Sequence, residues 1–276
     1  MTKDSATTMS GKDRKQYHIG CKPGDLAEYI MLVGDPGRAA KVAAHFEKIR
    51  FQNQHREYVT VTGKYKGMDL TVMATGMGQD NTEIAMVEIC QITRNPTFLR
   101  CGTTGALQPA ARLTDLLVSR GAVRLENLTS FYVLDGYPAV ADSDVLIAIG
   151  RACKKLRIPF HVGITASAVG FFGPQGRELP GFPIRYPNLQ ADLARMNVMN
   201  LEMETSALFI LASLRGLRAG AVCTVVASRP RNEKADPEEI LRGEKKCIEV
   251  SLKTFEYLRK MDADKKKRKL PLWLPA

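Results

Sequence analysis

The 276-residue sequence lacks the cysteine and histidine patterns that mark disulfide-bonded and metal-binding proteins. Its six cysteines stand alone, with no CxxC pair, and several lie in apolar runs such as AVCTVVA. Free cysteine in such surroundings behaves as a small apolar residue, so we expect reduced core thiols and no disulfide framework. The four histidines, at positions 18, 45, 55 and 161, show no ligand spacing, and we expect no transition-metal site.

Targeting and nucleotide-binding signals are also missing. The amino terminus has no apolar signal core, and no apolar run reaches the ~20 residues that span a bilayer. We therefore expect a cytoplasmic protein without a membrane partner. Neither GxxxxGKS/T nor GxGxxG occurs, which leaves P-loop and dinucleotide-binding functions without support.

Positive charge is in excess, with a net charge of +11 that raises the question of a nucleic-acid partner. The two ends, residues 1–16 and 261–276, carry +2 and +3 of it, the latter mainly in the run KKKRK. The surplus left to the body suits a small anionic ligand as well as it suits nucleic acid. A basic, non-catalytic nucleic-acid-binding protein thus stays an alternative, although no interleaving of basic and aromatic residues supports it, and we expect no such partner.

Apolar strand patterns alternate with helical patterns along the body of the chain, which favours an α/β fold with a mixed or mainly parallel sheet. We expect strands at residues 29–34, 58–67, 68–78, 97–102, 116–125, 160–169 and 216–228. Helices are expected at 37–46, 81–94, 143–156, 203–216 and 237–260. No linker divides the body. The predicted organisation is a flexible extension (1–16), one α/β domain (17–260) and a basic, solvated tail (261–276).

Three glycine-containing loops follow apolar strands, where an open α/β sheet places its ligands: VGDPGR (33–38), TGMGQD (75–80) and RCGTTGA (100–106). Glycines at strand ends are more often turn residues than parts of a binding site. Here, however, Arg38 and Arg100 accompany two of the loops, and Thr103 and Thr104 add hydroxyl groups. Amides, hydroxyls and guanidinium groups together favour an oxyanion such as phosphate.

Arg100 stands out because it lies in the apolar run FLRCG at the end of a predicted buried strand. A buried charge requires an anionic or strongly polar partner. That partner is either a bound anion or a carboxylate of the protein, and the sequence leaves both open.

A set of further motifs occurs in the order typical of one family. They are VGDPGR, HREY (55–58), TGMG, FLRCGTTGALQP (98–109), FFGPQGR (171–177), NLEMET (200–205) and VVASR (225–229). With them the sequence, over residues 17–260, resembles the uridine phosphorylase branch of the nucleoside phosphorylases. The resemblance implies a three-layer α/β/α domain. It also implies cleavage of a nucleoside by inorganic phosphate, which gives free base and ribose 1-phosphate in pyrimidine salvage.

The same resemblance assigns the phosphate and ribose sites. It implies phosphate binding by Gly34, Arg38, Arg56, Arg100 and Thr103. It implies ribose binding by His18, Thr103, Glu202, Met203 and Glu204, with Glu204 accepting hydrogen bonds from the sugar hydroxyls. His18 and Arg56 would reach into the site of a neighbouring subunit. The groups expected to take part in catalysis are Arg38, Arg100, Glu204 and Arg229.

The base site decides between branches of the family. The resemblance implies contacts from Thr104, Gly105, Phe171, Gln175, Arg177 and Arg229. Phe171 offers a stacking face, Gln175 carries both a donor and an acceptor, and the two arginines only donate, which suits the carbonyl-rich uracil. Purine-cleaving relatives usually have an aspartate after the serine at position 228, where this chain has Arg229. A purine or broader-specificity phosphorylase remains the first alternative.

Shared sites imply a homo-oligomer, with a dimer as its smallest unit and a hexamer as an alternative. We expect no cofactor, because inorganic phosphate is the co-substrate. Some relatives hold an inorganic cation at a subunit interface near the positions of Glu57 and Asn81, and the sequence leaves this open.

Overall fold

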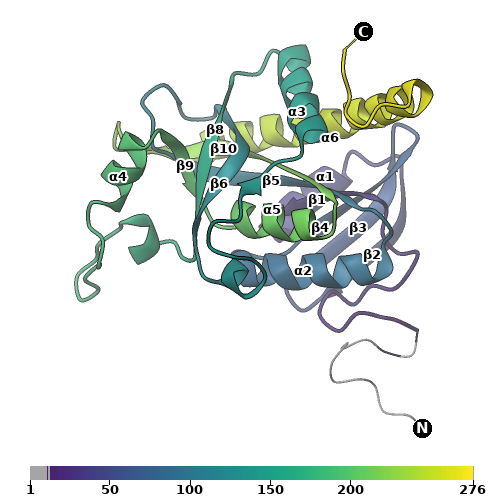
Figure 1. Cartoon of the computed structure of the whole chain (residues 1–276), viewed down its shortest axis with the longest axis horizontal. Coiled ribbons are helices and arrows are strands. Elements are labelled where there is room, and N and C mark those ends of the chain that lie inside the picture. Colours follow the sequence, from purple (N-terminus) through teal and green to yellow (C-terminus); the bar gives the residue numbers. More distant parts are fainter. Residues whose placement is uncertain (1–10, 12, 276) are drawn as a thin grey trace.

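The computed structural model describes residue 11 and residues 13–275 (Figure 1). Of the predicted extension over 1–16, residues 1–10 and 12 lie outside this range. Gln16, at its end, is buried, and its backbone N–H donates to the Cys21 carbonyl at 2.8 Å. Gln16 is therefore already part of the domain.

The described residues form one mixed sheet and the helices that cover it. The strands are β1 (Tyr29–Val33), β2 (Lys48–His55), β3 (Tyr58–Tyr65), β4 (Met68–Ala74), β5 (Thr97–Ala106), β6 (Leu116–Leu125), β7 (Ala139–Val140), β8 (Phe160–Ala168), β9 (Val198–Glu202), β10 (Arg218–Ser228) and β11 (Glu233–Lys234). The helices are α1 (Pro36–Ala43), α2 (Gln79–Ile92), α3 (Ser143–Leu156), α4 (Leu189–Arg195), α5 (Thr205–Leu214) and α6 (Pro237–Arg268), with short 3-10 turns η1 (Leu128–Phe131) and η2 (Gly173–Gln175). None of these helices combines the length and the apolar character needed to cross a membrane.

Apolar side chains along the central strands point alternately to the two faces of the sheet and so contribute to two cores, one on each face. In β1, Met31 and Val33 join a cluster with residues of α1, α3 and α6, whereas Ile30 and Leu32 join a cluster with residues of α2 and α5. Helices on both faces give the three-layer α/β/α domain that the sequence predicts. Figure 1 shows α3 and α6 on one side of the strands and α2 and α5 on the other.

Local signals fix where the helices begin. Asp35 caps α1 by accepting from the Gly37 N–H at 2.9 Å, and Pro36 occupies the first turn. Asp236 and Glu239 form a capping box at the start of α6, with Pro237 again in the first turn.

Strand β5 is the centre of the sheet because it pairs with three other strands. On one side it runs parallel to β10, and on the other it pairs with β1 and then with β9. The pairings β5–β10–β6–β8–β9–β5 close a ring, from which β1, β4, β3 and β2 extend in order. The last β1 pair ends at Arg100 and the first β9 pair begins at Gly105, so residues 101–104 have no strand on that side.

Besides the two-residue strands β7 and β11 and the 3-10 turns, the sequence prediction did not include β2, α4 and β9. Strand β2 is mostly exposed and polar, and α4 and β9 are short, so none shows a strong apolar period. Residues 200–202 complete β9, and α5 begins after Glu204, two residues later than the predicted helix start at residue 203.

Helix α6 continues to Arg268, beyond its predicted end at residue 260, and so takes in half of the predicted tail. The reason is that α6 packs along α3, first through apolar residues as far as Met261 and then through an ion pair between side chains. Lys265 pairs with Asp144 of α3, and the Asp144 carboxylate also accepts from the Trp273 backbone N–H at 2.9 Å. The Arg151 guanidinium lies 4.6 Å from the ring centres of both Tyr257 and Trp273.

We expect Trp273→Ala to lower the free energy of unfolding by about 1–2 kcal/mol, because it removes a cation–π contact and the indole hydrogen bond to Asp264. Urea unfolding followed by circular dichroism measures this. Leu272→Ala, which removes a partly exposed side chain of the same segment, serves as the control and should change stability by less than about 0.5 kcal/mol. Equal effects of the two variants would contradict a specific role for the indole.

Candidate active site

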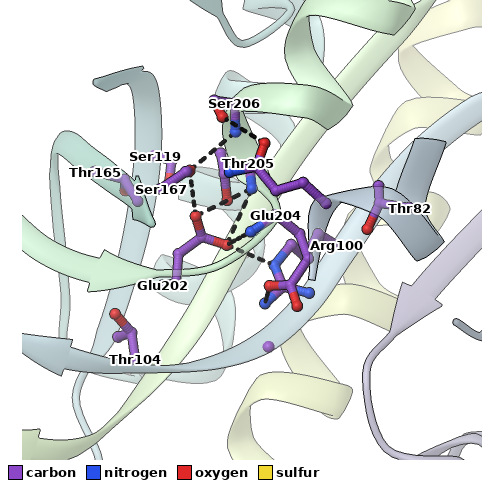
Figure 2. Close-up of polar contacts among 12 residues, drawn as sticks. Thr82, Arg100, Thr104, Ser119, Thr165, Ser167, Glu202, Glu204, Thr205 and Ser206 are labelled. Atoms are coloured by element: carbon purple, nitrogen blue, oxygen red, sulfur yellow. Dashed lines mark hydrogen bonds and ion pairs between the residues drawn. The ribbon is translucent and has the colours of Figure 1, made fainter. Parts of the chain in front are cut away.

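Arg100 projects from β5 toward α5 and meets two carboxylates (Figure 2). Its Nε lies 2.9 Å from Glu202 Oε2, and its Nη2 pairs with Glu204. Burial alone would lower the pKa of the guanidinium, but Glu204 and Glu202 raise it above its ordinary value. The partner that the sequence left open is therefore a pair of protein carboxylates. Nη1 has no partner among the described residues and remains able to donate to a ligand.

Glu202 is enclosed completely, with 0% of its side chain exposed. Its oxygens accept from Arg100 Nε, from the backbone N–H groups of Glu204 and Thr205 at about 3.0 Å, and from the Ser167 hydroxyl. These donors occupy the lone pairs of the carboxylate. In this structure the Glu202 side chain holds Arg100 and the first turn of α5, and its contact with ribose stays a prediction.

Glu204 is the second carboxylate that pairs with Arg100. It stands at the N-cap of α5, and its Oε1 accepts from the Gly78 N–H at 2.7 Å, which ties the TGMG loop to this site. Burial raises the pKa of its carboxyl group above the ordinary value, partly offset by Arg100. Met203, between the two glutamates, is half-buried.

Arg38 approaches the unpaired side of β5 from the other face of the sheet. Its Nη1 donates to the Cys101 carbonyl at 3.3 Å and its Nη2 to Glu244 Oε1 at 2.7 Å. Arg38 is 5% exposed, yet its Nε has no hydrogen-bond partner. A buried donor left unpaired is costly, and a bound anion would satisfy it.

Gly34 and Thr103 are two further residues of the predicted phosphate site, the first just after β1 and the second on β5. A Cβ on Gly34 would lie 3.4 Å from the Gly76 carbonyl, so the loops 33–38 and 75–80 touch. Thr103 is half-buried on the unpaired stretch of β5. The three glycine loops therefore converge, as predicted from their positions after strands.

A second group of predicted residues gathers beyond the end of β5. The Arg229 backbone N–H donates to the Ala106 carbonyl at 2.9 Å. Arg177 donates to Gln175 Oε1 at 2.8 Å and lies 3.9 Å from the ring centre of Phe171. Burial and the nearby Arg229 lower the pKa of Arg177 to about 10, and burial also lowers that of Arg229. No carboxylate pairs with either arginine in residues 13–275, so this pocket carries uncompensated positive charge.

Two predicted base contacts are weaker on this geometry. The Thr104 hydroxyl is buried, donates to the Leu201 carbonyl at 2.7 Å and accepts from Asn200 at 2.8 Å. Gly105 is half-buried on the same strand. The Thr104 hydroxyl thus uses its proton and one of its two lone pairs within the chain.

His18 and Arg56 lie apart from these groups, since no hydrogen bond or ion pair links them to Arg38 or Arg100 in the described residues. His18 Nδ1 is 2.7 Å from Glu88 Oε1, and Glu88 also accepts from the His18 and Ile19 backbone. Arg56 is exposed at the β2–β3 turn, 4.9 Å from the Tyr17 ring centre. A single chain therefore does not bring them into the site.

Glu57 and Asn81, the residues at which the sequence leaves an interface cation open, both lie near Gly76. A Cβ there would lie 2.8 Å from Asn81 Nδ2 and 3.7 Å from Glu57 Cγ, so these residues are neighbours. Within the described chain, no cluster of three or more His, Cys, Asp or Glu side chains has the arrangement of a metal site.

Comparison with known proteins identifies the family. The family described as the phosphorylase superfamily matches residues 28–257. The chain belongs to this family. It is 42% identical to a uridine phosphorylase of Thermococcus kodakarensis over 98% of this chain and 96% of that one. A nucleoside phosphorylase of Trypanosoma brucei, whose crystal structure is described as showing uridine phosphorylase activity, superimposes with a TM-score of 0.82 at 28% identity, over 89% of this chain and 98% of that one. A guanosine phosphorylase of Halorubrum lacusprofundi is 34% identical over 85% of this chain and 97% of its own length.

Sequence reasoning missed three residues that shape this phosphorylase site, namely Glu244, Lys41 and Ser167. Glu244 and Lys41 lie on helices among other charges, a pattern typical of a solvated surface. Ser167 ends a strand in an apolar stretch and carries no motif. Only the fold brings them to Arg38 and Glu202.

We expect Glu202→Gln to lower the free energy of unfolding by about 3 kcal/mol, because it breaks a buried, fully bonded ion pair. Guanidinium unfolding monitored by fluorescence or circular dichroism gives this value. Glu238→Gln is the control, since Glu238 is 89% exposed and its ion pair with Arg242 spans 4.0 Å. A loss below 1 kcal/mol in Glu202→Gln would show that the network is not structural.

Proposed function

We propose that this protein is a uridine phosphorylase, a pentosyltransferase that cleaves uridine with inorganic phosphate to uracil and ribose 1-phosphate. The observation that carries the proposal is the pair Arg177 and Arg229 beside Gln175, two guanidinium groups with no carboxylate partner among the described residues. Uncompensated donors of this kind attract the carbonyl oxygens of uracil and the negative charge that develops as the base leaves. The Thermococcus relative supports the same assignment.

Phosphate would occupy the open stretch of β5 between the two arginines. Arg38 offers its unpaired Nε from one face of the sheet, and Arg100 offers its free Nη1 from the other. Thr103 adds a hydroxyl from the strand itself. Because these donors are held in place by the protein, bound phosphate would already be oriented for attack. Little further entropy would then be lost when it reacts with the anomeric carbon.

Ribose would lie between phosphate and base, with Glu204 accepting hydrogen bonds from its hydroxyls. The glycosidic bond lengthens first and leaves positive charge on the ribosyl group. Phosphate then attacks from the face opposite the base, and the electron pair of the broken bond stays on uracil. No side-chain nucleophile is needed, because the work of the protein is placement and charge stabilisation.

Charge within the phosphate site supports a shared active site. Its ion pairs join three cations (Arg38, Lys41, Arg100) with three carboxylates (Glu202, Glu204, Glu244). A phosphate dianion therefore meets a site that is already neutral. An added cation, Arg56 of a neighbouring copy, would offset one of the two phosphate charges, and His18 would reach the ribose 5′-hydroxyl in the same way. We therefore include a homodimer, or a hexamer built from dimers, in the proposal.

A purine-cleaving phosphorylase is the competing function, favoured by the guanosine phosphorylase among the relatives. Adenine and guanine take up a proton at N7 as they leave, which calls for an acid. Position 229 is an arginine, and Gln175 and Arg177 suit carbonyl groups better than a basic nitrogen. A nucleic-acid-binding role is less favoured still, because Arg38 and Arg100 are buried.

The setting of the enzyme is part of the proposal. We place it in the cytoplasm, in pyrimidine salvage, which fits six free cysteines, most of them buried. Inorganic phosphate is its co-substrate, and no organic cofactor enters the scheme. The proposal leaves open whether a cation binds at a subunit interface near Glu57 and Asn81.

Base release from uridine, deoxyuridine, thymidine and inosine, with and without phosphate, tests the proposal. We expect phosphate-dependent release of uracil, with kcat/KM for uridine at least tenfold above that for inosine, because hypoxanthine has one carbonyl group where uracil has two that Gln175 and the arginines could bind. Release of uracil without phosphate would make the protein a hydrolase. Faster release of hypoxanthine than of uracil would overturn the base assignment.

A further inference from the structure

Glu244 is a buried carboxylate that joins two cations of helix α1. Its side chain, on α6, is 8% exposed; Oε1 lies 2.7 Å from Arg38 Nη2 and Oε2 lies 2.7 Å from Lys41 Nζ. Burial on its own would raise the pKa of this carboxyl group, but the hydrogen bonds from Lys41 and Arg38 lower it below the ordinary value. Glu244 is therefore ionised at neutral pH and holds α1 to α6.

The packing of α6 on the sheet brings this carboxylate to Arg38. A Cβ on Gly243 would lie 2.4 Å from Thr224 Oγ1, so only glycine lets the helix lie this close to β10. Thr224 pairs in register with Thr103, which stands on the open stretch of β5. Gly243 thus sets Glu244 beside the stretch of strand where phosphate is expected.

The position of Arg38 follows from its two anchors. Nη1 is held by the Cys101 carbonyl and Nη2 by Glu244, and a planar guanidinium fixed at both terminal nitrogens has one orientation. The buried Nε–H, which has no partner, then points in a single direction. Without Glu244, one of the two anchors is lost and the plane is free to turn about the other.

We propose that Glu244 is the positioning residue for phosphate binding, acting through Arg38 and contacting neither phosphate nor nucleoside itself. The inference rests on the proposed function, because it takes Arg38 as a phosphate ligand. It goes further by assigning a role to a carboxylate that would otherwise oppose an anion in the same site.

The repulsion expected between Glu244 and phosphate allows the direction of the change in phosphate binding to test the proposal. If Glu244 acted only as a nearby negative charge, its neutralisation would strengthen phosphate binding. If it positions Arg38, its neutralisation weakens phosphate binding despite the gain in positive charge, since an amide oxygen accepts from one cation while the amide N–H group faces the other.

The experiment compares full-length wild type with Glu244→Gln and Glu244→Asp in steady-state phosphorolysis. We expect the phosphate KM to rise about tenfold or more in Glu244→Gln, with the uridine KM within about twofold of wild type. Glu244→Asp keeps the charge but is one methylene shorter, so the phosphate KM should rise there too. A lower or unchanged phosphate KM in Glu244→Gln, or an unchanged one in Glu244→Asp, would overturn the proposal.

Glu256→Gln is the matched control. Glu256 lies on the same helix and also joins two cations, Lys66 and Lys253, each at 2.8 Å, away from Arg38. Its phosphate KM should equal that of wild type. A rise equal to that of Glu244→Gln would mean that any loosening of α6 has this effect, and would contradict a specific role for Glu244.

Calorimetric titration with inorganic phosphate separates this inference from the proposed function. If the wild type releases no uracil, the proposed function fails. The phosphate affinities of wild type and of the two Glu244 variants can still be compared. Weaker binding in both variants supports positioning by Glu244. Equal or tighter binding in Glu244→Gln contradicts it, whatever the nucleoside.

Discussion

Arg100 places a permanent positive charge on the central strand of a sheet that is covered on both faces. Two carboxylates must reach it, and they come from the end of β9 and the start of α5. That requirement brings β9 against the end of β5 and closes the ring of strands. The same carboxylates hold the first turn of α5 and the TGMG loop, so the geometry of the site depends on this one ion cluster.

The ring leaves residues 101–104 of β5 without a partner strand on one side, and Arg38 and Arg100 reach this stretch from opposite faces. Arg100 is anchored by Glu202 and Glu204, and Arg38 by Glu244 and a backbone carbonyl. In both cases a carboxylate fixes the guanidinium and leaves other donors free. The group of residues beyond the end of β5 is built differently, because no carboxylate among the described residues pairs with Arg177 or Arg229 and their positive charge is uncompensated.

Much of this arrangement could be predicted from sequence, since apolar alternation marks β1, β5 and β10, and glycine loops with arginines mark the phosphate side. Strand β2 escaped prediction because its residues are mostly exposed and polar, and β9 because it is five residues long. The NLEMET motif implies a ribose contact for Glu202 but does not reveal that Ser167, 35 residues earlier, donates to its carboxylate. Glu244 carries no motif, and only the close approach of α6 at Gly243 gives it a role.

The most direct test of the account is a crystal structure of the protein with inorganic phosphate bound. The account predicts phosphate beside residues 101–104 of β5, with an oxygen about 3 Å from Arg38 Nε and another within hydrogen-bonding distance of Arg100 or Thr103. It also predicts that Glu244 keeps its contact with Arg38 in that complex. Phosphate bound elsewhere, with Arg38 Nε still unpaired, would contradict the account.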